Sequence, residues 1–328
     1  MEGRTYYLAP LAGYTDVPYR LACRKMGCKY AYTALIDSGA LVHGNPDNDA
    51  ILQRDASEQW LGVQLLGSIP GDIAKSTEML DAMDYDEINY NLGCPMQKVI
   101  KRPAGAGLLK ECNQEIAFTC IKEMRKRVHG KPFTVKLRIL DFDDPEPTVQ
   151  FCQKLQELGV EGIAIHGRLA ESIYSGPVAT GVIRAVRETL SIPVTANGGI
   201  YGIEDANALH DATGCDRLMV ARGSLGNPWI FRELEMGRKC PPTHEELCDT
   251  MEEHIMGMVP IYGEKKAFLL ARKIIVAYIR GRGYSKEFRV RSTFVSGVDE
   301  FQRFVADLRQ AGPVCETANL SNTETQSI

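Results

Sequence analysis

Short apolar runs alternate with longer amphipathic stretches along roughly the first 240 residues. The apolar runs end in Gly, Asn, Asp or Arg and predict strands over Tyr6–Ala9, Tyr30–Ile36, Gly62–Leu66, Glu87–Asn91, Thr134–Leu137, Gly162–His166, Val194–Ala196 and Leu218–Ala221. The stretches between them predict helices over Val17–Met26, Asp72–Ala82, Asn113–Lys126, Pro147–Leu158, Val178–Leu190, Ile203–His210 and Leu225–Met236. Alternating strands and helices indicate parallel βα units. Eight such units predict an α/β fold of the (β/α)8 TIM-barrel type.

A doubly wound open sheet is the alternative fold. Its dinucleotide-binding form carries G-x-G-x-x-G after the first strand. That turn reads Ala9-Pro10-Leu11-Ala12-Gly13-Tyr14 here, which does not match. The barrel is therefore favoured. The link from Asp37 to Trp60 is the hardest part of the pattern to assign.

A domain boundary is predicted near Cys240-Pro241-Pro242-Thr243, because two prolines end the preceding helix. Thr243 with Glu245 and Glu246 is typical of a helix N-terminus, and helical periodicity continues to about Ala311. We therefore expect a barrel over residues 1–239 and a small helical domain over 240–312. Residues 313–328 are polar and aperiodic, and we expect a disordered tail there.

Composition and charge exclude some classes of protein. The 328 residues are 44% hydrophobic and 24% charged, as in ordinary globular proteins, and no apolar run suits a membrane-spanning helix. The ten cysteines form neither Cys-x-x-Cys nor a zinc pattern, so we expect reduced thiols, no metal and, since no signal peptide is visible, a cytoplasmic protein.

The net charge of −4 argues against nucleic-acid binding only if it is evenly spread. Between Ile261 and Ser292 there are nine basic and two acidic residues, a local charge of +7, so the rest of the chain has −11. This basic segment lies in the predicted helical domain. It is either a phosphate-binding surface or a solvated helix face.

Polar residues follow almost every predicted strand. In a barrel these ends meet at one mouth, where function collects. The turns Asn197-Gly198-Gly199 and Ala221-Arg222-Gly223 follow strands seven and eight, where many barrels bind phosphate, although glycine is also common in any tight turn. Lys136 lies within an apolar strand and needs an anion or electron-rich ring if it points into the barrel; on an edge strand it would face water. His166 is either a site residue or a structural one.

Cys94 is the sharpest candidate for chemistry. It lies between Gly93 and Pro95 just past a strand, where a turn exposes its side chain. A thiol of ordinary pKa is mostly protonated at pH 7 and can donate a proton, whereas one of depressed pKa is a nucleophile. The next residues include Lys98, Lys101 and Arg102 and end in an Ala/Gly-rich stretch. We expect a mobile basic loop beside the thiol; the alternative is an ordinary surface loop.

These residues resemble the tRNA-dihydrouridine synthases, flavoenzymes that reduce uridine in tRNA. The resemblance covers the barrel in order and extends to the helical segment. It rests on the segments Leu8-Ala9-Pro10-Leu11-Ala12-Gly13-Tyr14-Thr15-Asp16-Val17-Pro18-Tyr19-Arg20, Val63-Gln64-Leu65-Leu66-Gly67-Ser68, Asn89-Tyr90-Asn91-Leu92-Gly93-Cys94-Pro95 with Lys98, Lys136-Leu137-Arg138, His166-Gly167-Arg168, Asn197-Gly198-Gly199-Ile200 and Ala221-Arg222-Gly223-Ser224-Leu225-Gly226-Asn227-Pro228-Trp229.

The resemblance implies FMN at the barrel mouth, NADPH or NADH as reductant, and tRNA as substrate. It implies hydride transfer from reduced flavin to C6 of uridine and a proton from Cys94 to C5. The implied cofactor-binding residues are Pro10, Ala12, Gln64, Lys136, His166, Asn197, Gly199, Ala221, Arg222 and Gly223. The implied substrate-binding residues are Asn91 and Arg138 at the uracil carbonyls, Tyr174 framing the pocket, and Lys98, Lys101, Arg102, Arg168, Arg272, Lys273, Arg280, Arg282, Lys286 and Arg289.

Three positions depart from the usual family pattern, namely Leu169, Gly199 and Ala34-Leu35, and they leave the modified tRNA position open. Two other functions remain open. An FMN barrel that reduces a small molecule, such as a dihydropyrimidine or enone, would not need the helical domain. A non-catalytic RNA-binding protein would not bind flavin. The choice between NADPH and NADH cannot be predicted, and a monomer is the default expectation.

Overall fold

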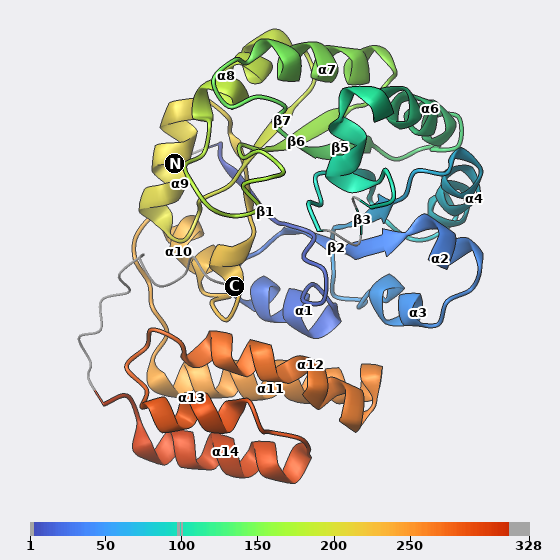
Figure 1. Cartoon of the computed structure of the whole chain (residues 1–328). Coiled ribbons are helices and arrows are strands. Elements are labelled where there is room, and N and C mark those ends of the chain that lie inside the picture. The colour runs from blue at the N-terminus through green and yellow to red at the C-terminus, as the bar shows by residue number, and fades with distance from the viewer. Residues whose placement is uncertain (1–2, 97–98, 100, 315–328) are drawn as a thin grey trace. The chain divides into compact units, whose positions relative to one another are not determined.

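Eight parallel strands close into a barrel in sequence order, β1-β2-β3-β4-β5-β6-β7-β8, in the computed structural model, which describes residues 3–96, 99 and 101–314 (Figure 1). The predicted (β/α)8 barrel is confirmed. The strands are β1 Thr5–Leu8, β2 Tyr30–Asp37, β3 Leu61–Leu66, β4 Glu87–Leu92, β5 Phe133–Arg138, β6 Gly162–His166, β7 Val194–Asn197 and β8 Arg217–Val220. Each lies within one residue of its predicted bounds. Lys98 and almost all of the predicted tail lie outside the described residues.

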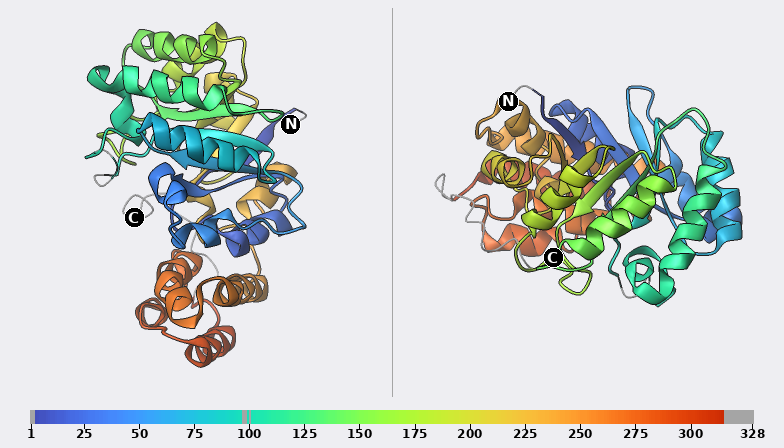
Figure 2. Two further views of the ribbon diagram at one scale, coloured as in Figure 1. Left: turned by 90° about the vertical axis from the view of Figure 1, so that its right-hand side faces the viewer. Right: turned by 90° about the horizontal axis from the view of Figure 1, so that it is seen from above.

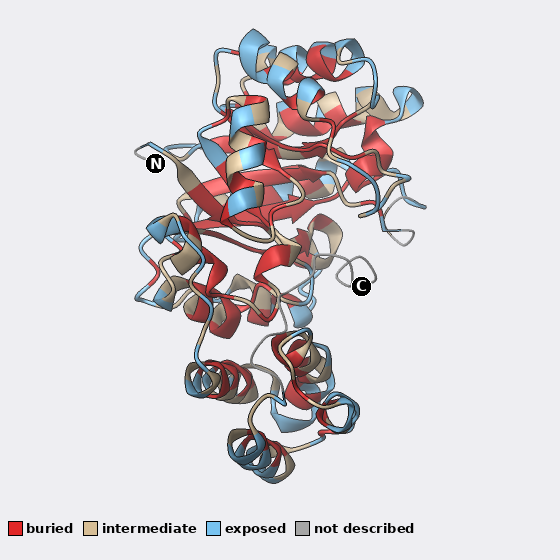
Figure 3. Cartoon of the chain, turned by 90° about the vertical axis from the view of Figure 1, so that its left-hand side faces the viewer, coloured by how far each residue is buried: buried red, intermediate tan, exposed pale blue. Residues whose placement is uncertain are grey.

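Burial of the strands explains why the sequence pattern predicted them well. All six residues of β3 and all six of β4 are buried, as expected of strands covered on both faces. The barrel strands form the buried centre, and the surrounding helices are exposed on their outer faces (Figure 3). Because all strands are parallel, their carboxyl ends share one mouth of the barrel.

The chain divides into two compact units. The first comprises residues 1–15, 29–200 and 204–221, and the second comprises residues 16–28, 201–203 and 222 onward. The first therefore holds the eight strands, whereas the second joins the C-terminal helices to two short segments from earlier in the chain. The predicted domain boundary at residue 240 stays a prediction.

Helices cover the outside of the strands in the first unit, and α4, α6 and α7 follow one another around the barrel (Figure 2). The link that the sequence pattern left unassigned holds two short helices, α2 and α3. The helices of this unit are α2 Ser38–Val42, α3 Asp47–Leu52, α4 Pro70–Asp81, α6 Gln114–Arg125, α7 Glu146–Glu157, α8 Thr180–Thr189 and α9 Ile203–Thr213, which begins in the second unit; η1 Gly105–Leu109 and η2 Glu111–Asn113 are 3-10 helices.

The second unit contains the predicted helical segment as four helices, α11 to α14. Asp16 caps α1 by accepting from the Tyr19 N–H at 3.1 Å, and Thr243 caps α11, as its sequence predicted. Its helices are α1 Val17–Lys25, η3 Arg222–Ser224, α10 Ile230–Met236, α11 His244–Tyr262, α12 Glu264–Ile279, α13 Lys286–Ser292 and α14 Val298–Ala311.

The start of α10 is the least accurate of the predicted helix boundaries. The periodicity placed the start of a helix at Leu225, but α10 begins at Ile230. Gly226 has a left-handed φ of +64°, which interrupts the helix, and a Cβ there would lie 2.2 Å from the carbonyl carbon of Ala277. A close approach of α12 therefore requires glycine at this point. Within residues 3–96, 99 and 101–314, no helix is long and apolar enough to cross a membrane.

Candidate active site

Three polar residues from adjacent strands lie in one row at the barrel mouth. The strand register pairs Arg138 of β5 with His166 of β6, and His166 with Asn197 of β7. All three are at the last residue of their strands and are buried. The fold therefore brings together three predicted site residues, of which the first and the last are 59 positions apart in the sequence.

Lys136 lies one layer deeper and reaches across the barrel interior. Its Nζ donates to Oδ1 of Asn197 at 3.0 Å, and Nδ2 of Asn197 donates to the Met219 carbonyl at 2.7 Å. Burial and the nearby Arg138 guanidinium lower the pKa of Lys136 to about 7. A bound anion would raise this pKa again, so the amine is suited to an anionic or electron-rich ligand.

Cys94 lies in the turn after β4, and hydrogen bonds hold both its backbone N–H and its backbone carbonyl. Oδ1 of Asn91 accepts from the N–H groups of Gly93 at 3.0 Å and Cys94 at 2.9 Å, and the Cys94 carbonyl accepts from the Ala106 N–H at 3.0 Å. Gly105 has a φ of +54°, and a Cβ there would lie 2.8 Å from the Cys94 carbonyl oxygen. The predicted basic loop thus returns to pack directly on Cys94.

The thiol of Cys94 is in its protonated form at neutral pH. Burial raises its pKa above the ordinary thiol value, and the charges of Arg138 and Lys136 lower it by less. The side chain is half-buried, so it remains accessible to a reactant. A protonated, accessible thiol can donate a proton, whereas a nucleophile would need a depressed pKa.

Arg138 joins the loops that follow β4 and β6. Its Nε donates to the Gly93 carbonyl at 2.9 Å, Nη1 to the Leu169 carbonyl at 2.8 Å and Nη2 to the Ile173 carbonyl at 2.6 Å. Its guanidinium also lies 5.8 Å from the centre of the Tyr174 ring. We predicted that Arg138 and Asn91 contact the uracil; in the structure both side chains hold the backbone of loops that border the mouth.

Ile173 has a φ of +49°, an unfavourable value for a β-branched residue. Its carbonyl is the one that accepts from Nη2 of Arg138, and its side chain is largely exposed. The contact with Arg138 therefore stabilises a strained turn in the loop after β6.

His166 has a defined tautomer. Nη1 of Arg168 lies 3.2 Å from Nε2 of His166, and since a guanidinium can only donate, Nε2 accepts and the ring proton is on Nδ1. Arg168 also donates through Nε to the Gly176 carbonyl at 2.9 Å. Arg168 was predicted to bind substrate; the structure places it, buried, against His166.

The turn after β7 has the geometry of a ligand-binding loop. Gly198 and Gly199 have left-handed φ values of +126° and +75°, and a Cβ on Gly198 would lie 3.0 Å from Cδ2 of His166. Glycine therefore leaves backbone groups exposed beside the row at the mouth. Together with the Lys136 amine, this turn fits a flat cofactor that ends in a phosphate.

Gln64 is buried within β3, and the other remaining predicted residues of the first unit lie at the rim. Arg102 is exposed and pairs with Asp37 at 2.8 Å, and Lys101 is exposed. Pro10 is half-buried and Ala12 exposed in the loop after β1, and Ala221 follows β8 directly. These positions suit contacts with a ligand that enters from solvent.

Residues predicted from the second unit divide into buried and exposed sets. Gly223 is buried in η3, and the Arg222 guanidinium lies 5.8 Å from the centre of the Tyr201 ring. Arg282 stacks at 5.2 Å from the Trp229 ring centre and donates to Oδ1 of Asn227 at 2.9 Å, so it supports this unit's own fold.

The cations predicted to contact tRNA differ in how exposed they are. Arg272 donates through Nε to the Val295 carbonyl at 3.0 Å, and Arg280 is half-buried. Lys273, Lys286 and Arg289 are exposed, the last two on α13. These three are the best placed to meet phosphates.

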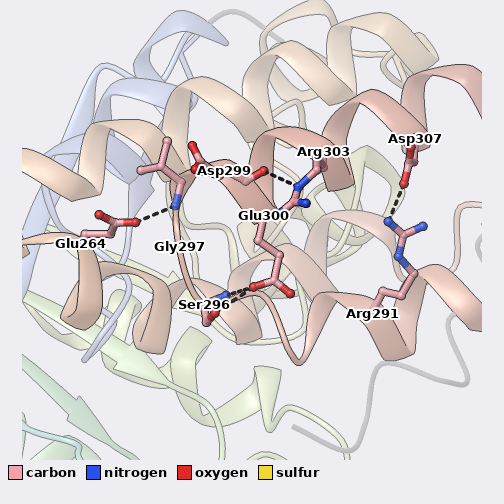
Figure 4. Close-up of a pocket in the computed structure, with 9 residues that line it drawn as sticks. Glu264, Arg291, Ser296, Gly297, Asp299, Glu300, Arg303 and Asp307 are labelled. Atoms are coloured by element: carbon pink, nitrogen blue, oxygen red, sulfur yellow. Dashed lines mark hydrogen bonds and ion pairs between the residues drawn. The ribbon is translucent and has the colours of Figure 1, made fainter.

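A pocket in the second unit is lined by charged residues, several of which are paired within the unit (Figure 4). Arg291 pairs with Asp307 at 2.5 Å, Glu300 accepts from Ser296, and Glu264 accepts from the Val298 N–H at 2.9 Å. We therefore do not assign it to the candidate active site.

Three polar residues of the barrel interior were missed as candidate site residues, although the sequence contains a signal for them. Glu87, Asn89 and Thr134 lie below the mouth, on β4 and β5. The signal was a polar residue at every second position of β4 and of β5, in strands whose other residues are apolar. This period of two marks a polar face that points into the barrel.

Comparisons with known proteins show the family of the chain. Residues 7–312 match the family model described as dihydrouridine synthase. The chain is 32% identical to tRNA-dihydrouridine synthase B of Yersinia pestis, covering 86% of this chain and 88% of that protein, and 30% identical to tRNA-dihydrouridine synthase B of Pasteurella multocida, covering 86% of each. A probable tRNA-dihydrouridine synthase of Rickettsia conorii is 32% identical over 86% of each chain.

A solved structure supports the fold alone. Histamine dehydrogenase from Rhizobium sp. 4-9 superposes with a TM-score of 0.51 at 12% identity and covers 93% of this chain. The chain spans 61% of that protein's length. The match is evidence for the shared architecture and not for a shared substrate.

Proposed function

The chain belongs to the dihydrouridine synthase family, and we propose that it reduces the 5,6-double bond of specific uridines in tRNA. The observation that carries this proposal is the position of Cys94, a half-buried, protonated thiol fixed at the mouth of a barrel that also presents Lys136 and Asn197. A reduction of this kind needs a hydride source for C6 and a proton donor for C5 of the base.

We propose that FMN occupies the mouth. Lys136, Gln64 and His166 would border its ring, and the glycine turn after Asn197, together with Ala221, Arg222 and Gly223, would hold its phosphate. Pro10 and Ala12 would border it from the loop after β1. When bound and reduced by NADPH or NADH, FMN supplies a hydride to C6 of the uracil ring.

Cys94 would supply the proton at C5. Its pKa is raised by burial, so the thiol is protonated over the physiological range. The two hydrogen bonds from backbone N–H groups to Asn91 and the one to its own carbonyl hold it at the mouth. This arrangement holds the donor in place before the base arrives, which lowers the entropic cost of reaching the transition state.

We propose that tRNA is held by exposed cations of both units. Lys101 and Arg102 follow Cys94 closely in the sequence, and Lys98 stands between Cys94 and Lys101 in the sequence. Lys273, Lys286 and Arg289 present charge from the helices of the second unit. A barrel mouth cannot admit a stacked base, so the target uridine must leave the tRNA stack.

The experiment is to incubate the purified protein with FMN, NADPH and an unmodified tRNA mixture and to count dihydrouridine by mass spectrometry. Deleting the gene in its host and mapping dihydrouridine along every tRNA identifies the position. Dihydrouridine that forms in vitro and disappears from one position in the deletion strain is the expected result. A protein that binds no FMN and forms no dihydrouridine would refute the proposal, and reduction of free uracil without tRNA would favour a small-molecule reductase.

A further inference from the structure

A continuous chain of side-chain hydrogen bonds runs down the barrel interior from the turn that holds Cys94. Asn91 Nδ2 donates to Gln64 Oε1, Gln64 Nε2 donates to Asn89 Oδ1, and Asn89 Nδ2 donates to Thr134 Oγ1, each at 2.7 Å. The Thr134 hydroxyl then donates to Oε1 of Glu87 at 2.5 Å. Every donor in this chain points to the next member counted from Asn91, and every member lies on β3, β4 or β5.

The direction of the chain is fixed at both ends. At the mouth the backbone groups of Gly93 and Cys94 can only donate, so Oδ1 of Asn91 must face them. At the other end Oε1 of Glu87 accepts from both the Thr134 and the Tyr32 hydroxyls, so this oxygen faces Thr134 as an acceptor. If the side-chain amide of Gln64 or of Asn89 alone were rotated by 180°, two donors or two acceptors would face each other. The amide orientation of Gln64 is therefore set by groups at both ends of the chain.

Glu87 is the acceptor that completes this arrangement. It is buried, and its Oε1 also accepts from the Tyr32 hydroxyl at 2.5 Å. Burial raises the pKa of Glu87 to about 7, so the ionised form is costly at neutral pH. A carboxyl group in a barrel interior has a physical explanation here, because a chain of donors that all point the same way needs a final acceptor.

We propose that Glu87, Asn89 and Thr134 are positioning residues that hold the amide of Gln64 and, through Asn91, the turn of Cys94. None of the three is in the set of residues predicted to touch cofactor or substrate. The roles of Gln64 and Cys94 rest on the proposed function, but their coupling to Thr134 can be measured without cofactor or tRNA. The alternative is a polar layer that serves only the stability of the barrel.

Thr134→Val tests the coupling because it removes one hydroxyl and keeps the branched shape of the side chain. Asn89 then loses its acceptor, and the constraint on Gln64 and Asn91 relaxes. We expect the Cys94 thiol to become more exposed and to react with iodoacetamide about fivefold faster, the effect of losing one hydrogen bond of ordinary strength. The rate is measured peptide by peptide by mass spectrometry, and the exposed thiol of Cys112 gives an internal standard in every sample.

Two further variants separate positioning from stability. Thr134→Ser keeps the hydroxyl and should restore the wild-type rate at Cys94. Thr195→Val makes the same exchange at a second barrel threonine, which is buried two residues before Asn197, and should leave that rate unchanged. Thr134→Ala, which also lacks the hydroxyl, replaces Thr134→Val if the valine variant does not fold.

An unchanged Cys94 rate in both hydroxyl-free variants would overturn the proposal, as would an equal change in Thr195→Val. With tRNA, Thr134→Val should lower kcat about fivefold and leave KM for tRNA unchanged. If the wild-type protein forms no dihydrouridine while the alkylation pattern holds, only the proposed function fails. If dihydrouridine forms but neither the alkylation rate of Cys94 nor kcat changes in the hydroxyl-free Thr134 variants, only the positioning role fails.

Discussion

Nε of Arg138 donates to the carbonyl of Gly93 at 2.9 Å, one residue before the proposed proton donor. The same guanidinium holds the carbonyls of Leu169 and Ile173 in the loop after β6. One buried side chain therefore sets the separation of two loops that border the mouth. Only the planar fork of arginine can make these three contacts together.

Arg138→Lys should lower the rate of dihydrouridine formation about tenfold, because a lysine replaces three donors in fixed directions by one mobile ammonium. The turn of Cys94 and the strained turn at Ile173 would both relax. Single-turnover kinetics with saturating tRNA measure this loss. Arg125→Lys is the matched control, since Arg125 makes its contacts to Val128 and Glu161 on the outside of the same unit. Equal rates in Arg138→Lys and wild type would show that the loop contacts are dispensable.

Cys94→Ala should slow dihydrouridine formation by a factor of about 10² or more and leave flavin binding intact. The proton donor is lost, whereas Lys136, Asn197 and the glycine turn remain. Flavin absorbance of the purified variant and the rate with tRNA measure the two effects. Cys112→Ala, at an exposed thiol of the same unit, should change neither.

The pH profile tests the same role of Cys94. A donor works in its protonated form, and burial raises the pKa of this thiol. The rate should therefore stay level up to the pH at which ordinary thiols ionise, about 8.5, and fall only above it. A rate that rises as pH increases from 7 to 9 would indicate a thiolate nucleophile instead.

The order of strands and helices followed from sequence because each strand is buried and each covering helix is amphipathic. The meeting of Cys94, Lys136, His166 and Asn197 near one barrel mouth was also predicted from sequence, since parallel topology alone brings strand ends together. Residue roles were harder to predict. The sequence shows that Arg138 ends a strand, but not that its guanidinium meets three carbonyls from other loops. Such contacts depend on the paths of loops, and these cannot be predicted from the sequence because loops lack a periodic hydrophobic pattern.

Glu87 should make the stability of the barrel depend on pH. Its pKa is raised from about 4.3 in an unfolded chain to about 7 in the fold, so the native state binds the extra proton between these values. The free energy of unfolding should therefore fall as pH rises from about 4 to 7, by roughly 3–4 kcal/mol at most, and level off above 7. The groups that face Glu87 and enter this balance are Tyr7, Tyr32, Thr134, Arg217 and Glu161.

Urea unfolding of Glu87→Gln measures this effect, because the variant keeps an acceptor oxygen but cannot ionise. Trp60 packs against Tyr7, Tyr30 and Tyr32 near this site, so its fluorescence in a Trp229→Phe background reports on the barrel alone. The variant should lose the decline in stability between pH 4 and 7. An identical decline in both proteins would assign it to another group.

Lys286 and Arg289 should supply part of the salt dependence of tRNA binding. Both are exposed on α13, within the segment of local charge +7. Replacing both by Ala removes about two phosphate contacts, so the slope of log affinity against log salt should become shallower by about 1.5–2. Filter binding at several salt concentrations measures the slope. Lys126→Ala is the control, since this exposed lysine of the first unit pairs with Glu123 at 2.7 Å and should keep the wild-type slope. If the double variant also keeps that slope, the basic face of α13 does not contact tRNA phosphates, and the tRNA must be held elsewhere.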